Sequence, residues 1–442
     1  MTLTPGDKVH AASKERPAAP PSVEKRRNRD KGARSGALCL VLWLARLVGS
    51  PARKVHIVLP ATAGSLGDQA VLSGMVEVIR SVGLDAPVQV TLRNWIPHGY
   101  PDAPESVRLR VHGSRIRSGL SLAWMLRDCS QLIVLGTDII EGNYSRSHVR
   151  DLVLLSNRTV ALGVTVHICG FSFSESPNAE AVLWLRRLDR RVLCSCRDAL
   201  SARRFEMHVA RPAELVTDPA FLLPARLEAS TAVDAHEWMR HRRSAGDVLL
   251  GVNVNAIAYR RSPFDVCEAF VSALSEVMRR RSVSVLLLPH DLRNDQSDIP
   301  PMTKVQLALE TEFPGRCRLV GAPVAAGDVK YLAGNCDLIV SGRLHLAVAA
   351  LSQDRPVIGI EYHDKFRGIF RVFDIEDLLL SHAQLLEEGR LAALILKAIC
   401  NLGEAREGFA RSRSAMIQGI SRLSETLRPL ARAPRHRRKS GS

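Results

Sequence analysis

The sequence lacks the features that mark a membrane span, a zinc site or a common nucleotide-binding fingerprint. No apolar run in its 442 residues approaches the roughly 20 residues that a transmembrane helix needs. Its nine cysteines form neither a CxxC pair nor a Cys/His cluster with zinc spacing, so we expect reduced thiols and no metal site. There is no P-loop and no GxGxxG. The composition, 46% hydrophobic and 24% charged, is typical of a globular chain long enough for two domains.

The formal net charge of +16 lies mainly in the two ends of the chain. Residues 1–35 and 404–442 together carry +12, which leaves +4 for everything between them. Because that remainder is only mildly basic, the fold itself does not favour a specific nucleic-acid partner. Both ends are charged with little to bury, which predicts a disordered basic tail over 1–35 and a helix followed by a basic tail over 404–442.

Residues 36–52 hold a short apolar segment that imitates a secretion signal. Arg46 interrupts it, and no small-residue cleavage site follows. We interpret it as an apolar or amphipathic helix that packs on the fold or lies at a membrane surface. The expected location is therefore cytoplasmic, with peripheral contact between the basic ends and the anionic inner face of the membrane as a further hypothesis.

Short β-branched runs alternate with amphipathic stretches, which predicts parallel strands with crossover helices. The first set of expected strands covers residues 54–60, 88–92, 131–136, 159–170 and 191–196. The second set covers residues 247–255, 282–289, 316–321, 336–342 and 356–362. Residues 229–246 lose the alternation and gain charge, which indicates a linker. We therefore expect an α/β protein with two Rossmann-like, doubly wound domains, 53–228 and 247–403, that face a cleft.

In such sheets ligands bind beyond the carboxyl ends of the strands, so the loops there are the candidate sites. In the first of them, GSLGDQAV, Gly67 allows a tight turn and Asp68 can cap a helix whose start would bind an anion or a hydroxylated ligand. A capping turn without a ligand explains this loop equally well. In the second, Asp138 and Glu141 follow a strand, where they accept hydrogen bonds from sugar hydroxyls or form a solvated turn.

Cationic side chains follow other expected strands. Arg197 is placed to bind a carboxylate or phosphate, or to pair with the neighbouring Asp198. In VSGRLHLAVAA, a helix begins near Arg343, so Arg343 and His345 flank its free amides in an anion trap. Lys365, after the next strand, is a second cation for the same anion. His290 lies at another strand end, where it helps to bind phosphate or caps a loop.

Five segments resemble, in chain order, the pattern of the polysaccharide pyruvyl transferase family. The pattern has an early glycine and aspartate loop, RD-x-x-S, D-P-A-F, and S-x-R-L-H followed by P-x-I-x-I-x-Y and a lysine. This sequence has GSLGDQAV, RDALS, TDPAFLL, VSGRLHLAVAA and PVIGIEYHDK. The similarity leaves the two ends of the chain unexplained, and the loop LGTDIIEGN holds less glycine than is common in the family.

The resemblance implies a GT-B-like fold and transfer of a pyruvyl group from phosphoenolpyruvate to sugar hydroxyls, which forms a ketal without a metal or another cofactor. The donor's phosphate and carboxylate need several cations or helix starts. The expected donor-binding residues are Arg197, Arg343, Leu344, Lys365 and His290. His345 is the expected general acid for the enol methylene. Asp68 or Asp138 would orient or deprotonate the acceptor, a choice that the sequence leaves open, and Gly67, Asp138 and Glu141 would form the acceptor-side loops.

Two other functions remain compatible with the sequence. A GT-B glycosyltransferase with a nucleotide-sugar donor would use the same cations for its phosphates. A non-catalytic polyanion-binding protein would depend on the basic ends and not on His345. For a pyruvyl transferase, the acceptor is a glycan or a lipid-linked saccharide, such as a surface polysaccharide or its precursor, and one sequence does not distinguish between them.

Overall fold

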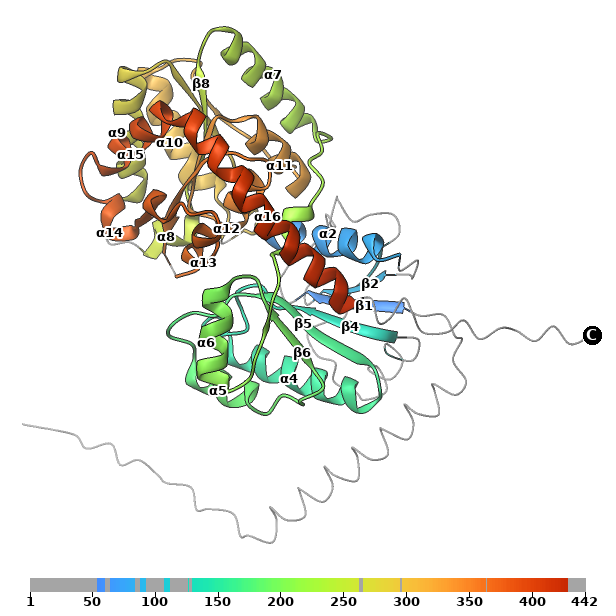
Figure 1. The fold of residues 1–442 in the computed structure, drawn as a ribbon. Coiled ribbons are helices and arrows are strands. Elements are labelled where there is room, and N and C mark those ends of the chain that lie inside the picture. Colours follow the sequence, from blue (N-terminus) through green and yellow to red (C-terminus); the bar gives the residue numbers. More distant parts are fainter. Residues whose placement is uncertain are drawn as a thin grey trace, which may run out of the picture.

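The structure, a computed structural model, describes residues 54–59, 64–83, 88–92, 107–111, 126, 129–261, 265–294, 296–362 and 364–427. The tail expected over 1–35, the helix expected over 36–52 and the basic tail after Leu427 lie outside the described residues. Two α/β units are visible, one above the other in Figure 1, each with a parallel sheet between layers of helices.

The N-terminal domain contains a seven-stranded parallel sheet in the order β3-β2-β1-β4-β5-β6-β7. Its strands are β1 Lys54–Leu59, β2 Val88–Leu92, β3 Val107–Val111, β4 Cys129–Leu135, β5 Thr165–Phe171, β6 Leu193–Cys196 and β7 Glu214–Leu215. Its helices are α2 Leu66–Ser81, α4 Arg146–Ala161, α5 Ala179–Leu185, α6 Ala199–Val209 and the 3-10 turn η1 Pro219–Leu222. The order reverses between β1 and β4, so the loops after these two strands form the switch point at which doubly wound sheets bind ligands.

The C-terminal domain repeats this arrangement with six parallel strands in the order β10-β9-β8-β11-β12-β13. The strands are β8 Val248–Asn253, β9 Val283–Leu287, β10 Cys317–Leu319, β11 Leu338–Ser341, β12 Val357–Glu361 and β13 Leu379–Ser381. The helices are α7 Ser230–Ser244, α8 Ala256–Arg261, α9 Val266–Arg280, α10 Ile299–Glu312, α11 Ala326–Asn335, α12 Leu344–Leu351, α13 Phe366–Val372, η2 Glu376–Leu378, α14 His382–Leu385, α15 Arg390–Cys400 and α16 Leu402–Leu427. Its switch point lies between β8 and β11.

The predicted doubly wound class is therefore confirmed, but strands β3, β7 and β13 were not predicted, and two predicted segments differ from the structure. The strand predicted for 159–170 starts too early, because residues 159–161 end helix α4 and β5 begins at Thr165. The segment 229–246, interpreted as a linker, is mostly helix α7. That helix buries only Ala232, Ala235 and Met239, so its narrow apolar stripe is hard to recognise in a charged sequence.

Apolar packing joins the two domains. One buried cluster runs from α2 and η1 of the N-terminal domain to α11 and α12 of the C-terminal domain. Helix α16 starts on the C-terminal domain and crosses to the N-terminal domain, where Leu423 and Leu427 are fully buried (Figure 1). Gly419 of this helix lies against Thr217, close enough that a Cβ there would come within 2.9 Å of the threonine.

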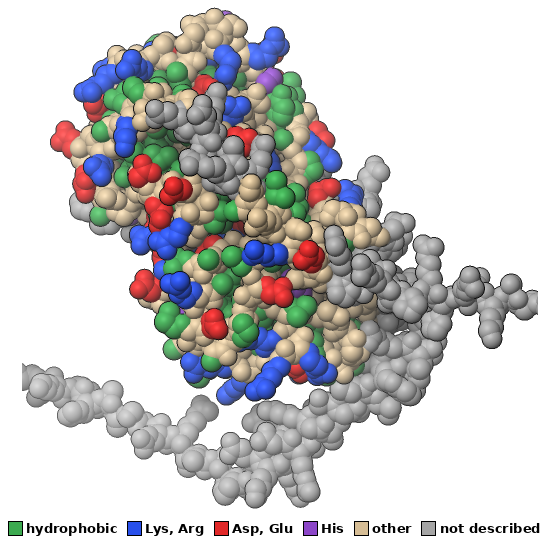
Figure 2. Space-filling model, viewed as in Figure 1, with side chains coloured by type: hydrophobic (Ala, Val, Ile, Leu, Met, Phe, Trp, Pro, Cys, Tyr) green, Lys and Arg blue, Asp and Glu red, His purple; other side chains and the backbone are tan. Residues whose placement is uncertain are grey.

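The surface carries both signs of charge. Figure 2 shows Lys and Arg side chains interspersed with Asp and Glu over the face drawn. Among the helices that the structure describes, none combines the length and apolar character required to cross a bilayer.

Candidate active site at the domain junction

The carboxyl ends of the two sheets meet where loops from opposite domains pair through their backbones. Leu66, at the start of α2, donates its N–H to the carbonyl of His290 at 3.2 Å. Leu292 donates to the carbonyl of Gly64 at 2.8 Å, and Ser65 and Asp291 form a β-bridge. The start of α2 is therefore fixed against the loop that follows β9, and the carboxyl ends of both sheets face one another.

Arg197 is the centre of a polar group that spans this junction. It follows β6, is 3% exposed, and donates from Nη1 to Asp218 Oδ2 and from Nε to Ser172 Oγ, both at 2.7 Å. Nη1 also lies 3.3 Å from Nε2 of His345 in the other domain. The alternative partner Asp198 instead caps α6 by accepting from the backbone N–H of Ser201 at 2.7 Å. Arg197 therefore connects the first domain directly to His345.

His345, near the start of α12, has a partner for Nε2 in either protonation state. A neutral ring accepts there from Arg197, and a protonated ring faces Asp218 Oδ2 at 3.6 Å. The other side of the ring rests on α2, where a Cβ at Gly67 would lie 2.4 Å from Nδ1. A histidine that is supported in both states and held in a fixed orientation suits proton transfer.

Two carboxyl groups beside His345 have opposite pKa shifts. Burial raises the pKa of Asp68, which is 8% exposed, above its usual value. Burial alone would also raise the pKa of Asp218, but Arg197 and then His345 outweigh it and hold the pKa of that carboxyl well below its usual range. Asp68 is not the N-cap of α2 as expected, because Ser65 caps the helix and accepts from the Asp68 N–H at 3.3 Å.

Lys365 extends from the loop after β12 to two residues of the opposite domain. Its Nζ is in direct contact with Asp138 Oδ2 and donates to Tyr144 Oη at 2.6 Å. Burial opposes the charged form of the amine, but Asp138 and Tyr144 together raise the pKa of Lys365. For Asp138 the effect of burial is likewise outweighed by Lys365, followed by Arg197 and His345, so its pKa lies well below the usual range.

The residue before Asp138 has an unusual backbone conformation. Thr137 is buried and has a φ of 42°, in the left-handed region that β-branched residues rarely adopt. Its carbonyl accepts from the N–H of Ser172 at 2.8 Å, which fixes the turn. Backbone strain of this kind concentrates at functional sites, and Thr137 directly precedes Asp138.

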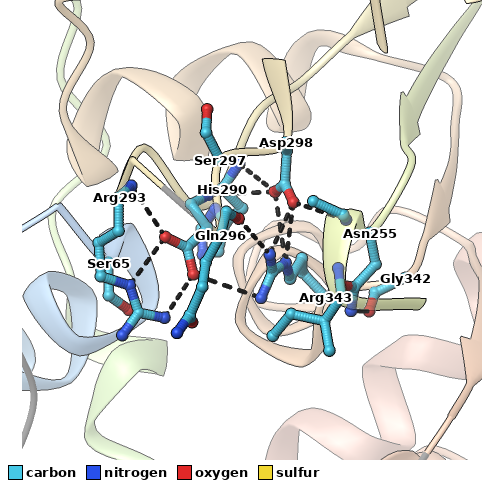
Figure 3. A network of polar contacts seen from close by, with 12 residues as sticks. Ser65, Asn255, His290, Arg293, Gln296, Ser297, Asp298, Gly342 and Arg343 are labelled. Carbon is cyan, nitrogen blue, oxygen red and sulfur yellow. Dashed lines mark hydrogen bonds and ion pairs between the residues drawn. The ribbon is translucent and has the colours of Figure 1, made fainter. Parts of the chain in front are cut away.

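Arg343 is the predicted cation that lies apart from the others. Its guanidinium donates to Asp298 at 2.7 Å and to the carbonyl of Gln296 at 3.1 Å, and Nη1 lies 3.4 Å from Asp291 (Figure 3). With only 14% of its side chain exposed, Arg343 is occupied by two carboxylates of its own domain. Leu344 is buried in the apolar cluster that joins the domains, so only its backbone is available to a ligand.

His290 is 4% exposed, and neither ring nitrogen has a hydrogen-bond partner within the described part of the chain. Burial, with smaller effects from His345 and Arg343, lowers the pKa of His290 well below its usual value. The ring is therefore neutral and keeps both a donor and an acceptor unused next to the group around His345.

A cavity of about 550 Å³ opens on the other side of Lys365. It lies between loops of both domains, and its lining includes Tyr144, Ser174, Glu361 and Lys365. The predicted Glu141 also lines it and accepts from the backbone N–H of Ser174 at 2.9 Å. The wall of this cavity thus offers hydroxyl, carboxylate and ammonium groups together with a half-exposed tyrosine ring.

The structure places most predicted site residues at one junction and adds others. Asp68, Gly67, Asp138, Arg197, His290, His345 and Lys365 surround it, whereas Arg343 is directed to its own carboxylates. Sequence reasoning did not select Asp218, Tyr144 or Asp298 as site residues. The D-P-A-F segment was the available signal for Asp218, whereas nothing in the sequence marked the other two.

The side chains described here include no group of three or more His, Cys, Asp or Glu residues suited to a metal ion. The expectation that no metal or cofactor is required stays a prediction.

Solved structures with the same architecture include a glycosyltransferase from Rickettsia africae, with 9% identity, a TM-score of 0.54, and coverage of 86% of this chain and 99% of that one. HepE from Anabaena, in complex with UDP and glucose, has 12% identity, a TM-score of 0.53, and coverage of 84% and 98%. The trehalose 6-phosphate synthase of Burkholderia multivorans has 12% identity, a TM-score of 0.53, and coverage of 86% and 99%. At such identities the likeness shows the fold alone, which is that of the GT-B glycosyltransferases.

The family is shown by a different comparison. The polysaccharide pyruvyl transferase family matches residues 66–364, which is more than half of the chain. The chain therefore belongs to this family. No curated protein sequence matches it.

Proposed function

We propose that this protein transfers a pyruvyl group from phosphoenolpyruvate to two hydroxyls of a surface polysaccharide or its precursor, with formation of a pyruvate ketal. The observation that carries the proposal is the junction itself, where His345 contacts Arg197 and both lie near Asp138, which holds a second cation, Lys365. A donor with a phosphate and a carboxylate needs more than one cation, and its enol methylene needs a proton source. The junction offers both.

The proposed roles follow from these positions. Arg197, Lys365, the backbone at Leu344 and the unused ring N–H of His290 bind the donor's anionic groups, while Arg343 holds the loop before α12 through Asp298. His345 gives a proton to the methylene carbon as a hydroxyl oxygen bonds to the adjacent carbon. Over the whole reaction two hydroxyl protons are released, of which one remains in the new methyl group and one leaves with phosphate.

The cavity beyond Lys365 is the proposed acceptor site. Its hydroxyl and carboxylate groups can exchange hydrogen bonds with a glycan, and the exposed ring of Tyr144 gives a sugar an apolar surface. We also propose a cytoplasmic location, with the basic ends of the chain in contact with an anionic membrane when the acceptor is lipid-linked. No specific nucleic-acid partner is expected.

Donor binding tests the proposal by thermal unfolding of the purified chain with phosphoenolpyruvate or with UDP-sugars. At about 100 times its dissociation constant a ligand stabilises the folded state by roughly 2.7 kcal/mol, which raises the melting temperature measurably. Phosphoenolpyruvate is expected to stabilise the native chain and to lose its effect in Lys365→Met. The exposed Lys397→Met serves as a matched control that keeps the response.

The same measurement separates the alternative donor class. Because HepE is seen with UDP and shares the fold, a nucleotide-sugar donor is the competing assignment. Stabilisation by a UDP-sugar without any response to phosphoenolpyruvate would overturn the pyruvyl transfer assignment.

A further inference from the structure

Three residues from two domains form an interdomain clasp: Lys365, Asp138 and Tyr144. The Lys365 amine contacts the Asp138 carboxylate and donates to the Tyr144 hydroxyl, and Nζ lies 4.6 Å from the centre of the tyrosine ring. Tyr144 Oη in turn lies 3.4 Å from Asp138 Oδ2. Lys365 is 13% exposed, and its contacts with Asp138 and Tyr144 use two of the three N–H donors of the amine.

The clasp lies between the two parts of the site. Lys365 and Tyr144 line the cavity, while Asp138 is close enough to Arg197 and His345 for their charges to act on it. The clasp therefore separates the cavity from the group around His345. An acceptor bound in the cavity would thus contact Lys365 and Tyr144 on one side of the clasp, with Asp138 next to His345 on the other.

The proposed donor binds the Lys365 amine, which is paired with the Asp138 carboxylate in this structure. Under the proposed function, Lys365 binds one anionic group of phosphoenolpyruvate, and an ammonium group has only three N–H donors to share. A second anion at Lys365 would compete with the Asp138 carboxylate, and repulsion between the two would move the carboxylate away. Its strained neighbour Thr137 belongs to the same short loop, so a displaced Asp138 stays close to the donor.

We propose that the donor takes Lys365 from Asp138, and that the released Asp138 carboxylate then receives the proton of the acceptor hydroxyl. This inference rests on the proposed function and extends it to an order of binding, with the donor before the acceptor. It also selects Asp138, and not Asp68, as the base. Without the donor, Asp138 stays paired and the hydroxyl is not activated.

Asp138 and His345 together account for every proton transfer in the reaction. In the first half, the hydroxyl proton moves to Asp138, the hydroxyl oxygen bonds to the donor carbon, and His345 protonates the methylene. In the second half, the bond from that carbon to the phosphate oxygen breaks, and phosphate leaves with the electron pair and the proton of Asp138. The second hydroxyl then bonds to the same carbon and returns its proton to His345.

Calorimetric binding of phosphoenolpyruvate to the full chain tests the competition. Asp138→Asn keeps the shape of the side chain and removes the rival charge. We expect it to bind the donor about tenfold more tightly, the ratio that a charge-assisted hydrogen bond of about 1.4 kcal/mol produces. Tyr144→Phe removes the neutral hydroxyl that contacts Lys365 and Asp138 but keeps the carboxylate, so it should give a smaller gain. Asp151→Asn, at an exposed position on α4, is the matched control and should leave binding unchanged.

Turnover provides the second measurement, as phosphate release from phosphoenolpyruvate with a polysaccharide fraction as acceptor. Asp138→Asn should lower both kcat and the donor KM, a combination that a purely structural role does not give. Unchanged or weaker donor binding in a folded Asp138→Asn, while the native chain binds, would overturn the inference. Absence of donor binding to the native chain would instead overturn the proposed function.

Discussion

His290 buries an imidazole whose two nitrogens find no partner among the described residues. An unsatisfied buried polar group costs about 1–3 kcal/mol of folding free energy. A residue with that cost and no packing advantage is better explained by a ligand that supplies the missing hydrogen bond. His290 is therefore expected to bind the donor's phosphate. The sequence suggested this role only because His290 lies at a strand end.

The variant His290→Leu tests this explanation because stability and binding should change in opposite directions. We expect the free energy of unfolding in urea to rise by about 1 kcal/mol, since the unsatisfied group is removed. Phosphoenolpyruvate binding should weaken about tenfold, as for one lost hydrogen bond to a charged group. His290→Gln, which keeps an N–H donor, should retain more of the binding. A loss of stability with unchanged donor binding would favour the loop-capping role.

A site residue could be predicted from the sequence where its own segment indicated its role, and not where the role depends on distant partners. Arg197, His345 and Lys365 could be found from single strand ends, because parallel strands place their carboxyl ends at one edge. The orientation of Arg343 could not, since it depends on Asp298, 45 positions away in another loop. Asp218 was not selected because its role depends on Arg197 and His345, which lie next to it only in the folded chain.

At the scale of elements, helix α2 sits against the start of α12, and the closest approach is at Gly67. A Cβ there would lie 2.4 Å from Nδ1 of His345 and 3.0 Å from its Cγ, so the ring would have to move. Position 67 therefore requires glycine because a larger residue would take the space of the His345 ring. Gly64, two residues before α2, differs because its φ of 99° itself favours glycine.

Gly67→Ala should therefore reduce activity more than stability. Alanine favours a helix over glycine by about 1 kcal/mol, which offsets part of the clash, whereas displacement of His345 affects proton transfer directly. We expect phosphate release to fall at least about tenfold, with a melting temperature within a few degrees of the native value. Gly403→Ala, a helical glycine with open space around its Cβ position, is the control. Full activity in Gly67→Ala would show that the ring position is not restrictive.

The elements that sequence patterns did not predict are short, lie at sheet edges or bury few side chains. Strands β3, β7 and β13 lie toward the sheet edges, and the two- or three-residue strands β7 and β13 are too short for any periodicity. Helix α7 buries only three side chains against the C-terminal domain, so its segment was interpreted as a linker. The central strands could be predicted because burial on both faces makes them continuously apolar.

For the whole molecule, buried neutral histidines predict sensitivity to mild acid. Burial lowers the pKa of His167 to about 4, and Nε2 of this residue lies 2.8 Å from Ser195 Oγ. Between pH 6.5 and 4 the unfolded chain binds a proton there that the folded chain does not, so the free energy of unfolding falls as the pH drops. His290 acts in the same direction.

Urea unfolding at pH 7 and pH 5 measures this effect. We expect His167 alone to account for a loss of about 2 kcal/mol over that interval. His167→Gln can keep a hydrogen bond to Ser195 without a titrating group, so its loss should be smaller by that amount. The exposed His241→Gln should behave as the native chain does. Equal losses in His167→Gln and the native chain would show that His167 is not held neutral by the fold.

Helix α16 gives the chain a second passage between the domains, in addition to the segment between η1 and α7. Among the described residues the segment between η1 and α7 is the covalent connection, whereas packing holds α16 to the N-terminal domain, so a motion that keeps this packing costs least. Twisting of one domain relative to the other would instead pull α16 away from Thr217 and expose Leu423. Opening of the junction, which separates Lys365 from Asp138, is therefore coupled to the packing of α16 on the N-terminal domain.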